Sequence, residues 1–251
     1  MTTTDARPTP RPRRSALDRD TAMRLAATEY GRYLDQLRAL DADDWARPTE
    51  CPAWDVRAVA GHCLGMAEFA ASLPTMARQN AVASRRGGVF IDALTALQVQ
   101  EQAALTTAEL VACYAEVAPR AVRGRRRRSA VLGHVRMPGT ETVNGVADPW
   151  TFGYLFATIL TRDTWMHRVD TARATGRDLV LTPEHDGVLV ADVVAEWAGR
   201  HGQPYALTLT GPAGGRWDSG GPGLELDAVE FCRVLSGRGS GEGLLGVQVP
   251  F

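Results

Sequence analysis

The sequence predicts a mainly helical protein in which a bundle of amphipathic helices precedes a small α+β domain. Three observations support this fold class. Apolar residues recur every three or four positions in long segments before residue 200. Helix-capping residues begin several of these segments, and glycines follow their ends. Beyond Gly202 the pattern changes to short alternating stretches separated by turn-forming residues. We therefore assign residues 15–180 to the bundle and residues 181–251 to the α+β domain.

The first two helices are separated by an irregular connection. Residues 1–14 are rich in Thr, Pro and Arg, so we expect a disordered tail. The apolar spacing predicts a helix over residues 17–40, and two prolines interrupt the segment after it. Asp55 then caps a second helix. This helix places His62 on its buried stripe beside Gly65, which allows a neighbouring segment to approach closely.

The middle of the chain contains two further helical segments and a long connection. Residues 90–104 are periodic. Thr106 and Glu109 form a capping box that opens another helix, which should end near Arg123. Residues 125–147 show little helical period and several turn formers, so we expect a long loop there.

Two more helices have strong start signals. Asp148 followed by Pro149 predicts a cap for a helix over residues 150–174. Thr182 gives a similar signal for a helix over residues 183–200, where the bundle pattern ends.

The last residues combine strands and a helix. Residues 205–212 alternate like a strand, residues 214–223 are rich in turn formers, and residues 224–226 predict a short strand. Asp227 caps a final helix, which Gly237 ends.

The composition is typical of a soluble globular protein with one or two domains. Of the 251 residues, 45% are hydrophobic and 23% are charged, which argues against a disordered, collagen-like or coiled-coil protein. The 28 basic and 29 acidic residues leave a formal net charge of -1, so no global field attracts nucleic acid or an anionic membrane. Every basic residue is Arg, which indicates a GC-rich genome such as that of an actinobacterium.

The cysteines and the hydropathy pattern indicate the compartment. The four cysteines lie far apart, which excludes a C-x-x-C zinc ribbon or redox pair, and we expect them to be reduced. The N-terminal residues contain no apolar signal-peptide core, and no stretch approaches the roughly 18 apolar residues of a membrane helix. We therefore expect a cytoplasmic monomer or homodimer that binds neither membrane nor nucleic acid.

One face of the helix over residues 150–174 changes halfway from apolar to ionisable side chains. Asp163 and His167 stand four positions apart, so their Cβ atoms lie about 5 to 6 Å apart and both can bind one ion. His62, on the buried stripe of another helix, is the natural third ligand. Two nitrogens and one carboxylate suit a zinc-like ion with an open position for chemistry. Asp170 either fills that position or orients a histidine.

A purely structural explanation competes with this metal site. His62 would then donate to a backbone carbonyl, while Asp163, His167 and Asp170 would pair with neighbouring arginines on a solvated face. Because D-x-x-x-H is a weak motif, spacing alone favours the structural explanation.

Two other candidates have simple explanations. The Arg125–Arg128 run fits a solvated helix end better than a phosphate-binding patch, because no aromatic residues interleave with it. Cys63 follows His62 directly and points about 100° away from it, so we expect a packed side chain rather than a nucleophile.

Three motifs resemble those of a known family. The first is W-x-x-P-T followed by CPAWDVRAVAGH, the second is RDTWMHRVDTARATGR, and the third is FCRVLSGRG with a terminal VPF. Together they resemble the mycothiol-dependent maleylpyruvate isomerase family, within the wider DinB-like metalloprotein superfamily. The resemblance runs from about residue 17 to the last residue. It implies a DinB-like four-helix bundle with one long crossover, followed by a small α+β domain related to sterol carrier folds.

The resemblance also implies a site and a chemistry. A divalent metal, most often zinc, would be held by His62, Asp163 and His167, although the family usually has Glu in place of Asp163. The metal would lower the pKa of mycothiol, the thiol cosubstrate, and direct the thiolate to an electrophilic carbon. An arginine of the C-terminal domain would meet an anionic substrate. Arg233 is the best positional match and Arg238 the second, unless Arg233 only pairs with a glutamate three positions earlier.

Two functions of different classes follow from these observations. The first is a metal-dependent, thiol-using enzyme that acts on a small electrophilic, anionic substrate by cis/trans isomerisation or thiol transfer. The alternative is a non-catalytic ligand-binding protein on the same scaffold, in which any metal is structural. A set of three ligands with one open position favours the enzyme.

Overall fold

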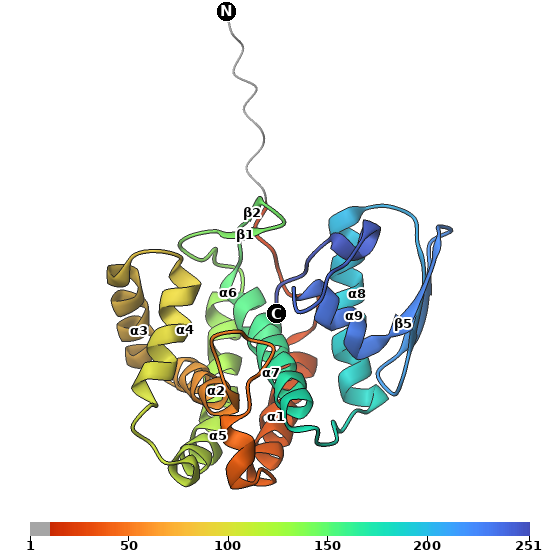
Figure 1. Ribbon diagram of the computed structural model, residues 1–251. Helices are drawn as coiled ribbons and strands as arrows, with labels where there is room; N and C mark the ends of the chain where they lie inside the picture. Colours follow the sequence, from red (N-terminus) through yellow and green to blue (C-terminus); the bar gives the residue numbers. More distant parts are fainter. Residues whose placement is uncertain (1–10) are drawn as a thin grey trace, which may run out of the picture.

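A computed structural model describes residues 11–251 and confirms a mainly helical protein with a small C-terminal sheet (Figure 1). Its first part contains the helices α1 (Arg19–Arg38), α2 (Val56–Ala71), α3 (Leu73–Arg86), α4 (Phe90–Glu101), α5 (Thr107–Leu132), α6 (Phe152–Tyr154) and α7 (Leu160–Thr175). Short helical turns, η1 (Ala42–Ala46) and η2 (Leu155–Ile159), precede α2 and α7. A hairpin of β1 (Glu141–Val143) and β2 (Val146–Asp148) connects α5 to α6.

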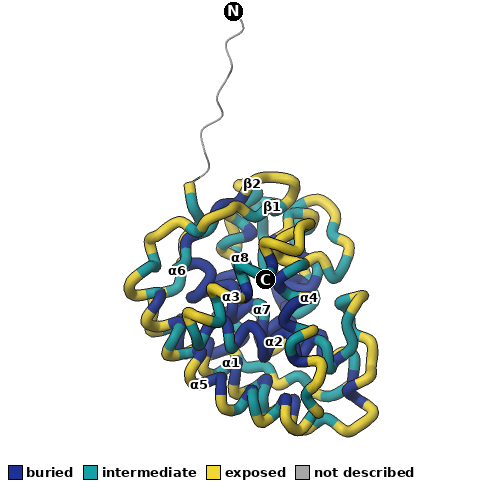
Figure 2. The backbone as a smooth tube through the Cα atoms, turned by 90° about the vertical axis from the view of Figure 1, so that its left-hand side faces the viewer, coloured by how far each residue is buried: buried dark blue, intermediate teal, exposed yellow. Residues whose placement is uncertain are grey.

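Four of these helices form the bundle. Helix α1 packs against α5 and α7, and α2 packs against the same two helices, so the four close into a ring. The chain passes from α2 to α5 through α3 and α4, which pack on each other and on α2. Figure 2 shows that buried positions gather around α2 and α7 in the interior. This arrangement confirms the expected four-helix bundle.

The C-terminal elements enclose a second apolar core. They are the turn η3 (Pro183–Gly187), helix α8 (Val188–His201), strands β3 (Ala206–Thr210), β4 (Gly215–Asp218) and β5 (Gly223–Asp227), helix α9 (Ala228–Leu235) and the turn η4 (Gly243–Gly246). Trp165, Met166 and Val169 of α7 pack into this core together with Trp197 and Phe231. Helix α7 therefore belongs to the bundle and also packs against the C-terminal elements.

The C-terminal sheet has the order β4-β3-β5. Strand β3 pairs antiparallel with β4, where Leu207 stands opposite Trp217, and parallel with β5, where Leu207 stands opposite Leu224. Strand β4 falls within the segment that the sequence pattern predicts as turns. The Asp227 side chain accepts hydrogen bonds from the backbone N–H groups of Val229 and Glu230 at 2.8 and 3.1 Å, which confirms the predicted cap of α9.

Helix α3 is absent from the sequence-based prediction. Ser72 caps it by accepting a hydrogen bond from the N–H of Thr75 at 3.3 Å, and Pro74 stands in its first turn. Among its residues, however, Gln79 and Ala83 alone are buried. Met76 on the same face packs against the core, so the inner face of α3 carries few large apolar residues, and the sequence analysis did not identify this helix.

Helix α5 continues to Leu132 rather than ending near Arg123, so the expected long loop begins later and contains the β1–β2 hairpin. The arginine run lies inside this helix. Arg125 donates to the Phe156 carbonyl at 2.7 Å, and Arg128 donates to the carbonyl of Ala70. The prediction of a solvated helix end is therefore wrong for Arg125 and Arg128, which are buried beneath neighbouring helices.

Asp148 does not cap a helix. Its carboxylate accepts hydrogen bonds from Arg13 at 3.0 Å and Arg200 at 2.7 Å, while Thr151 caps α6 by accepting from the N–H of Tyr154 at 3.1 Å. Arg13 belongs to the segment expected to be disordered, so that expectation is wrong for this residue. Residues 1–10 of the predicted tail lie outside the described residues.

The helix that carries the acidic and histidine stripe contains a π-turn. Residues Leu155–Ile159 form this turn between α6 and α7, without breaking the helical path. A π-turn inserts about one extra residue and changes the direction in which upstream side chains point. Among residues 11–251, none of the helices has both the length and the apolar character needed to cross a bilayer.

Candidate metal centre

Helix α2 presents His62 to the interior of the bundle. The helix begins where Asp55 accepts a hydrogen bond from the N–H of Ala58 at 2.7 Å, as the sequence predicts. Two turns later His62 faces α7 and is 2% exposed. A histidine buried this deeply requires polar partners.

Helix α7 supplies those partners from the opposite side. Oδ1 of Asp163 lies 3.3 Å from Nε2 of His62 and 3.5 Å from Nε2 of His167. One potential ligand atom from each of the three residues lies within 4.8 Å of the others. The structure therefore brings together all three residues that the sequence analysis proposed as ligands.

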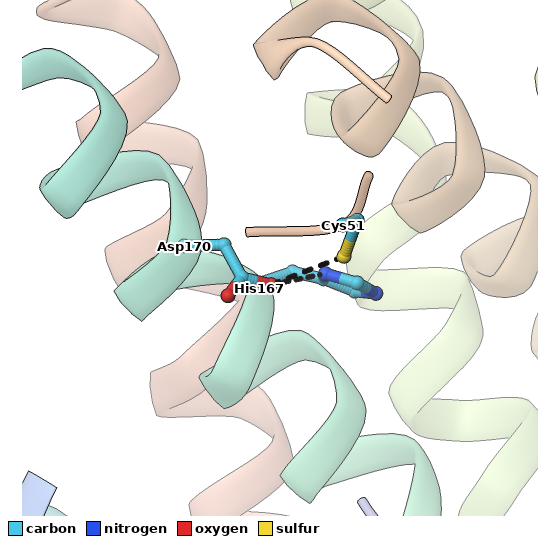
Figure 3. Close-up of side chains that lie close together, drawn as sticks. All are labelled: Cys51, His167 and Asp170. Carbon is cyan, nitrogen blue, oxygen red and sulfur yellow. Dashed lines mark hydrogen bonds and ion pairs between the residues drawn. The ribbon is translucent and has the colours of Figure 1, made fainter. Parts of the chain in front are cut away.

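The other ring nitrogens of both histidines point away from this cluster. Nδ1 of His62 donates to the side-chain carbonyl of Gln98 at 2.9 Å, and Nδ1 of His167 donates to Oδ2 of Asp170 at 2.9 Å (Figure 3). Because the amide and carboxylate oxygens accept hydrogen bonds from Nδ1–H, the proton of each neutral imidazole is on Nδ1. The Nε2 atom of each ring then keeps a free lone pair. Both lone pairs belong to the nitrogens that lie beside Asp163.

Neighbouring charges shift the pKa values of this buried cluster in opposite directions. Burial by itself would raise the pKa of Asp163, but the two histidines lower it far below its ordinary range. Burial would lower the pKa of His167, yet the carboxylates of Asp163 and Asp170 raise it well above its ordinary value. Oδ2 of Asp163 is buried and has no hydrogen-bond partner among the described residues. The cluster therefore favours positive charge between its side chains.

Gln98 is a site residue that the sequence analysis missed. It is fully buried in α4, where its amide nitrogen donates to Gln79 at 3.1 Å and contacts the sulfur of Met66 at 2.9 Å. These contacts orient the amide so that its oxygen accepts the Nδ1 proton of His62. The available signal was its spacing, because Gln98 stands on the same helix face as Leu94 and Leu97.

Gly65 provides the space that Gln98 occupies. A Cβ atom at this position would stand 2.5 Å from Cβ of Gln98, so the predicted close approach at Gly65 is confirmed. We expect Gly65→Ala to displace Gln98, to destabilise the fold by about 1–3 kcal/mol through overpacking, and to weaken metal binding by releasing His62.

The matched control for Gly65→Ala is Gly31→Ala, where a Cβ atom meets no atom within 4 Å in the middle of α1. Thermal unfolding and zinc titration of both variants provide the measurement. Equal zinc affinity of the Gly65→Ala variant and the unchanged chain would show that Gln98 does not position His62.

Two cysteines lie near the cluster in different environments. Cys63 is buried in the core of the bundle, as expected for a packed side chain, and burial raises the pKa of its thiol to about 12. Cys51 is half-buried in the connection before α2. The same connection carries Trp54, whose ring centroid lies 5.1 Å from that of His62 and 6.1 Å from that of His167. Trp54 therefore covers both histidines.

Asp170 is saturated by hydrogen bonds from other protein groups. Its Oδ1 accepts from Nε of Arg238 at 2.6 Å, and its Oδ2 accepts from Nη2 of Arg238 at 2.7 Å, from His167, and from the thiol of Cys51 at 3.6 Å. Burial by itself would raise the pKa of Asp170, but the bonds from His167 and Arg238 lower it to about 2. Cys51, His167 and Asp170 cluster tightly (Figure 3), yet the paired Arg238 makes them a hydrogen-bonded layer rather than a second cation site.

Arg233 lies apart from this layer. Its guanidinium donates to Glu50 at 2.7 Å through Nε and also pairs with Glu230, which stands three positions earlier in α9. The structure therefore contains the glutamate pairing that the sequence analysis kept as the alternative for Arg233. Of the two candidate arginines, Arg238 is the one that reaches a neighbour of the histidines.

A third acidic and histidine group, on α1 and η3, is an ion-pair network. Glu29, His185 and Asp186 lie close together and are buried. Arg168 donates to Glu29 at 2.7 Å and to Asp186 at 2.6 Å, and Arg32 also pairs with Asp186. The two guanidinium groups balance the negative charges of the two buried carboxylates. No excess negative charge is therefore left to bind a metal ion.

The fold and this geometry define a class of protein: a helix bundle with two histidines and one carboxylate converging between its helices, extended by a small C-terminal α+β part. A family model described as the mycothiol maleylpyruvate isomerase N-terminal domain matches residues 6–172 of the chain. The chain belongs to this family.

The chain is also similar to other known proteins. An uncharacterized protein of Mycobacterium tuberculosis, found in two strains, is 28% identical over 226 residues, which cover 82% of this chain and 80% of the relative. A crystal structure of the mycothiol-dependent maleylpyruvate isomerase superposes with a TM-score of 0.54 at 17% identity, covering 89% of this chain and 91% of that one. A histidine-to-alanine mutant of that isomerase gives a TM-score of 0.51 at 16% identity. At these identities the structural likeness establishes the fold alone.

Proposed function

We propose that this protein is a metal-dependent enzyme that binds a low-molecular-weight thiol of the mycothiol class and acts on a small electrophilic, anionic substrate. The reaction would be a cis/trans isomerisation or a transfer of the thiol sulfur. The observation that carries the proposal is the convergence of His62, Asp163 and His167, with both Nδ1 atoms held by hydrogen-bond acceptors. Family membership supports the thiol and the isomerase chemistry.

The residues present fit a divalent ion. Oδ2 of Asp163 is buried without a hydrogen-bond partner among residues 11–251, and the Nε2 atoms beside this carboxylate are the free acceptors of their rings. Two imidazole nitrogens and one carboxylate form a typical ligand set of catalytic zinc, in which one position stays open. When bound, such an ion lowers the pKa of a thiol that coordinates it, so that the thiolate exists at neutral pH.

The protein's own side chains would restrict access to that chemistry. Trp54 covers the imidazole rings, and His62 and His167 are almost completely buried, whereas the side chain of Asp163 is 18% exposed. A thiol would therefore approach from the exposed side of Asp163. Arg233, which the resemblance assigns to an anionic substrate, must release Glu50 before it can make that contact.

The test begins with the protein purified without added metal and without a histidine tag. Elemental analysis should find about one zinc-like ion per chain, and calorimetry should show that mycothiol binds to the metal-loaded protein but not to protein treated with a chelator. Isomerisation of maleylpyruvate is then the first activity to assay. A chain that takes up no metal even on reconstitution with Zn²⁺ would contradict the proposal. Metal without thiol binding would favour the non-catalytic ligand-binding protein.

A further inference from the structure

The C-terminal segment after α9 reaches the metal centre through one side chain. Helix α9 ends in a Schellman motif, in which the N–H of Gly237 donates to the Val234 carbonyl at 3.1 Å and the N–H of Arg238 donates to the Arg233 carbonyl at 2.9 Å. Gly237 adopts a φ of 84°, a left-handed conformation that favours glycine. This turn fixes the direction in which the chain leaves α9 at Arg238.

The Arg238 side chain is committed to Asp170. Its Nε and Nη2 atoms bind the two carboxylate oxygens of Asp170 side by side, and Nη1 contacts Oγ of Ser236 at 3.2 Å. The bidentate arrangement fixes both the position and the plane of the carboxylate. Nη2 also lies 3.7 Å from the sulfur of Cys51, so the arginine contacts the connection that carries Trp54 as well.

Asp170 in turn holds His167. Oδ2 accepts the Nδ1 proton of the imidazole, so the orientation of the carboxylate decides the tautomer and the ring plane of a proposed ligand. The Arg238 charge also cancels that of Asp170, so a divalent ion with Asp163 leaves a net charge of +1, which one thiolate neutralises. Without the guanidinium, the carboxylate would remain buried with an uncompensated charge.

We propose that Arg238 is a positioning residue of the metal centre, which acts through Asp170 to hold His167 in its metal-binding orientation, rather than a contact for the substrate. The proposal rests on the proposed metal site. It assigns the C-terminal part a share in metal affinity, although all three ligands come from α2 and α7.

The experiment measures the zinc dissociation constant of four chains by competition with a chelating dye. These are the unchanged chain, Arg238→Ala, Arg238→Lys and the control Arg216→Ala, whose side chain is exposed in β4. Loss of a residue that orients a ligand costs about 10–100-fold in metal affinity. We expect a loss in this range for Arg238→Ala, a smaller loss for Arg238→Lys, and zinc affinity unchanged within error for Arg216→Ala.

A second measurement and a second variant distinguish the possible outcomes. The Co²⁺-loaded Arg238→Ala protein should show a changed visible absorption spectrum, which a merely structural role would leave unaltered. If Arg238→Ala does not fold, as judged by circular dichroism, Arg238→Lys decides, because it keeps the positive charge but cannot form the bidentate contact. Unchanged zinc affinity in every folded Arg238 variant would overturn the proposal. Failure of the unchanged chain to bind zinc would instead overturn the proposed function.

Discussion

Replacing His62 or His167 by alanine is expected to abolish stoichiometric metal binding while leaving the helical circular dichroism signal largely intact. Each substitution removes one of the three proposed protein ligands. Because loss of a residue that merely orients a ligand costs about 10–100-fold, loss of a ligand itself should weaken zinc binding by more than about 100-fold. The helices themselves are held by the two apolar cores, which these substitutions touch little.

Elemental analysis after dialysis provides the measurement for both histidine variants. The matched control is His134→Ala, because His134 is exposed in the connection after α5 and lies outside the cluster. Stoichiometric metal retained in both the His62 and His167 variants would mean that the ion binds elsewhere.

Replacing Glu29 by alanine is expected to lower the free energy of unfolding by about 3–5 kcal/mol, the usual cost of removing one partner from a buried ion pair. Glu29 is fully buried and accepts hydrogen bonds from Arg168 at 2.7 Å and from His185 at 2.6 Å. Its removal leaves the Arg168 guanidinium with excess charge in the interior, where α1, α7 and η3 meet.

Urea unfolding followed by circular dichroism measures the effect of Glu29→Ala. Glu116→Ala is the control, because Glu116 pairs with Arg120 on the exposed face of α5, and surface pairs of this type contribute little. A loss below about 1 kcal/mol for Glu29→Ala, similar to an exposed pair, would show that water or rearrangement satisfies Arg168.

Helical periodicity and local caps predicted which side chains share a face, whereas the resemblance to a known family favoured a metal site over a purely structural one. Asp163 and His167 share a face because they stand one turn apart, and His62 lies on the buried stripe of a helix that Asp55 caps. Both facts follow from the geometry of an α-helix and require no knowledge of the tertiary structure. The packing of α2 against α7 then brings the three side chains together.

The parts that could not be predicted depend on partners far away in the sequence. In the sequence, Arg125 and Arg128 look like part of a solvent-exposed run, because the carbonyl groups that accept their hydrogen bonds belong to segments far away along the chain. Asp148 resembles a helix cap, but Arg13 and Arg200 bind it instead. Arg238 appeared to be the weaker candidate for the site, since its partner Asp170 is 68 positions away along the chain.

The distance along the chain between the ligands and Arg238 also sets an order of events during synthesis. All three ligands have been added once residue 167 is made, and residue 238 follows 71 positions later. At about 5–20 residues per second, this interval lasts about 4–14 s. During that time a nascent bundle has the three proposed ligands but lacks Arg238, the proposed positioning residue. Metal captured co-translationally would therefore be held loosely at first and tightly only after the C-terminal part has docked.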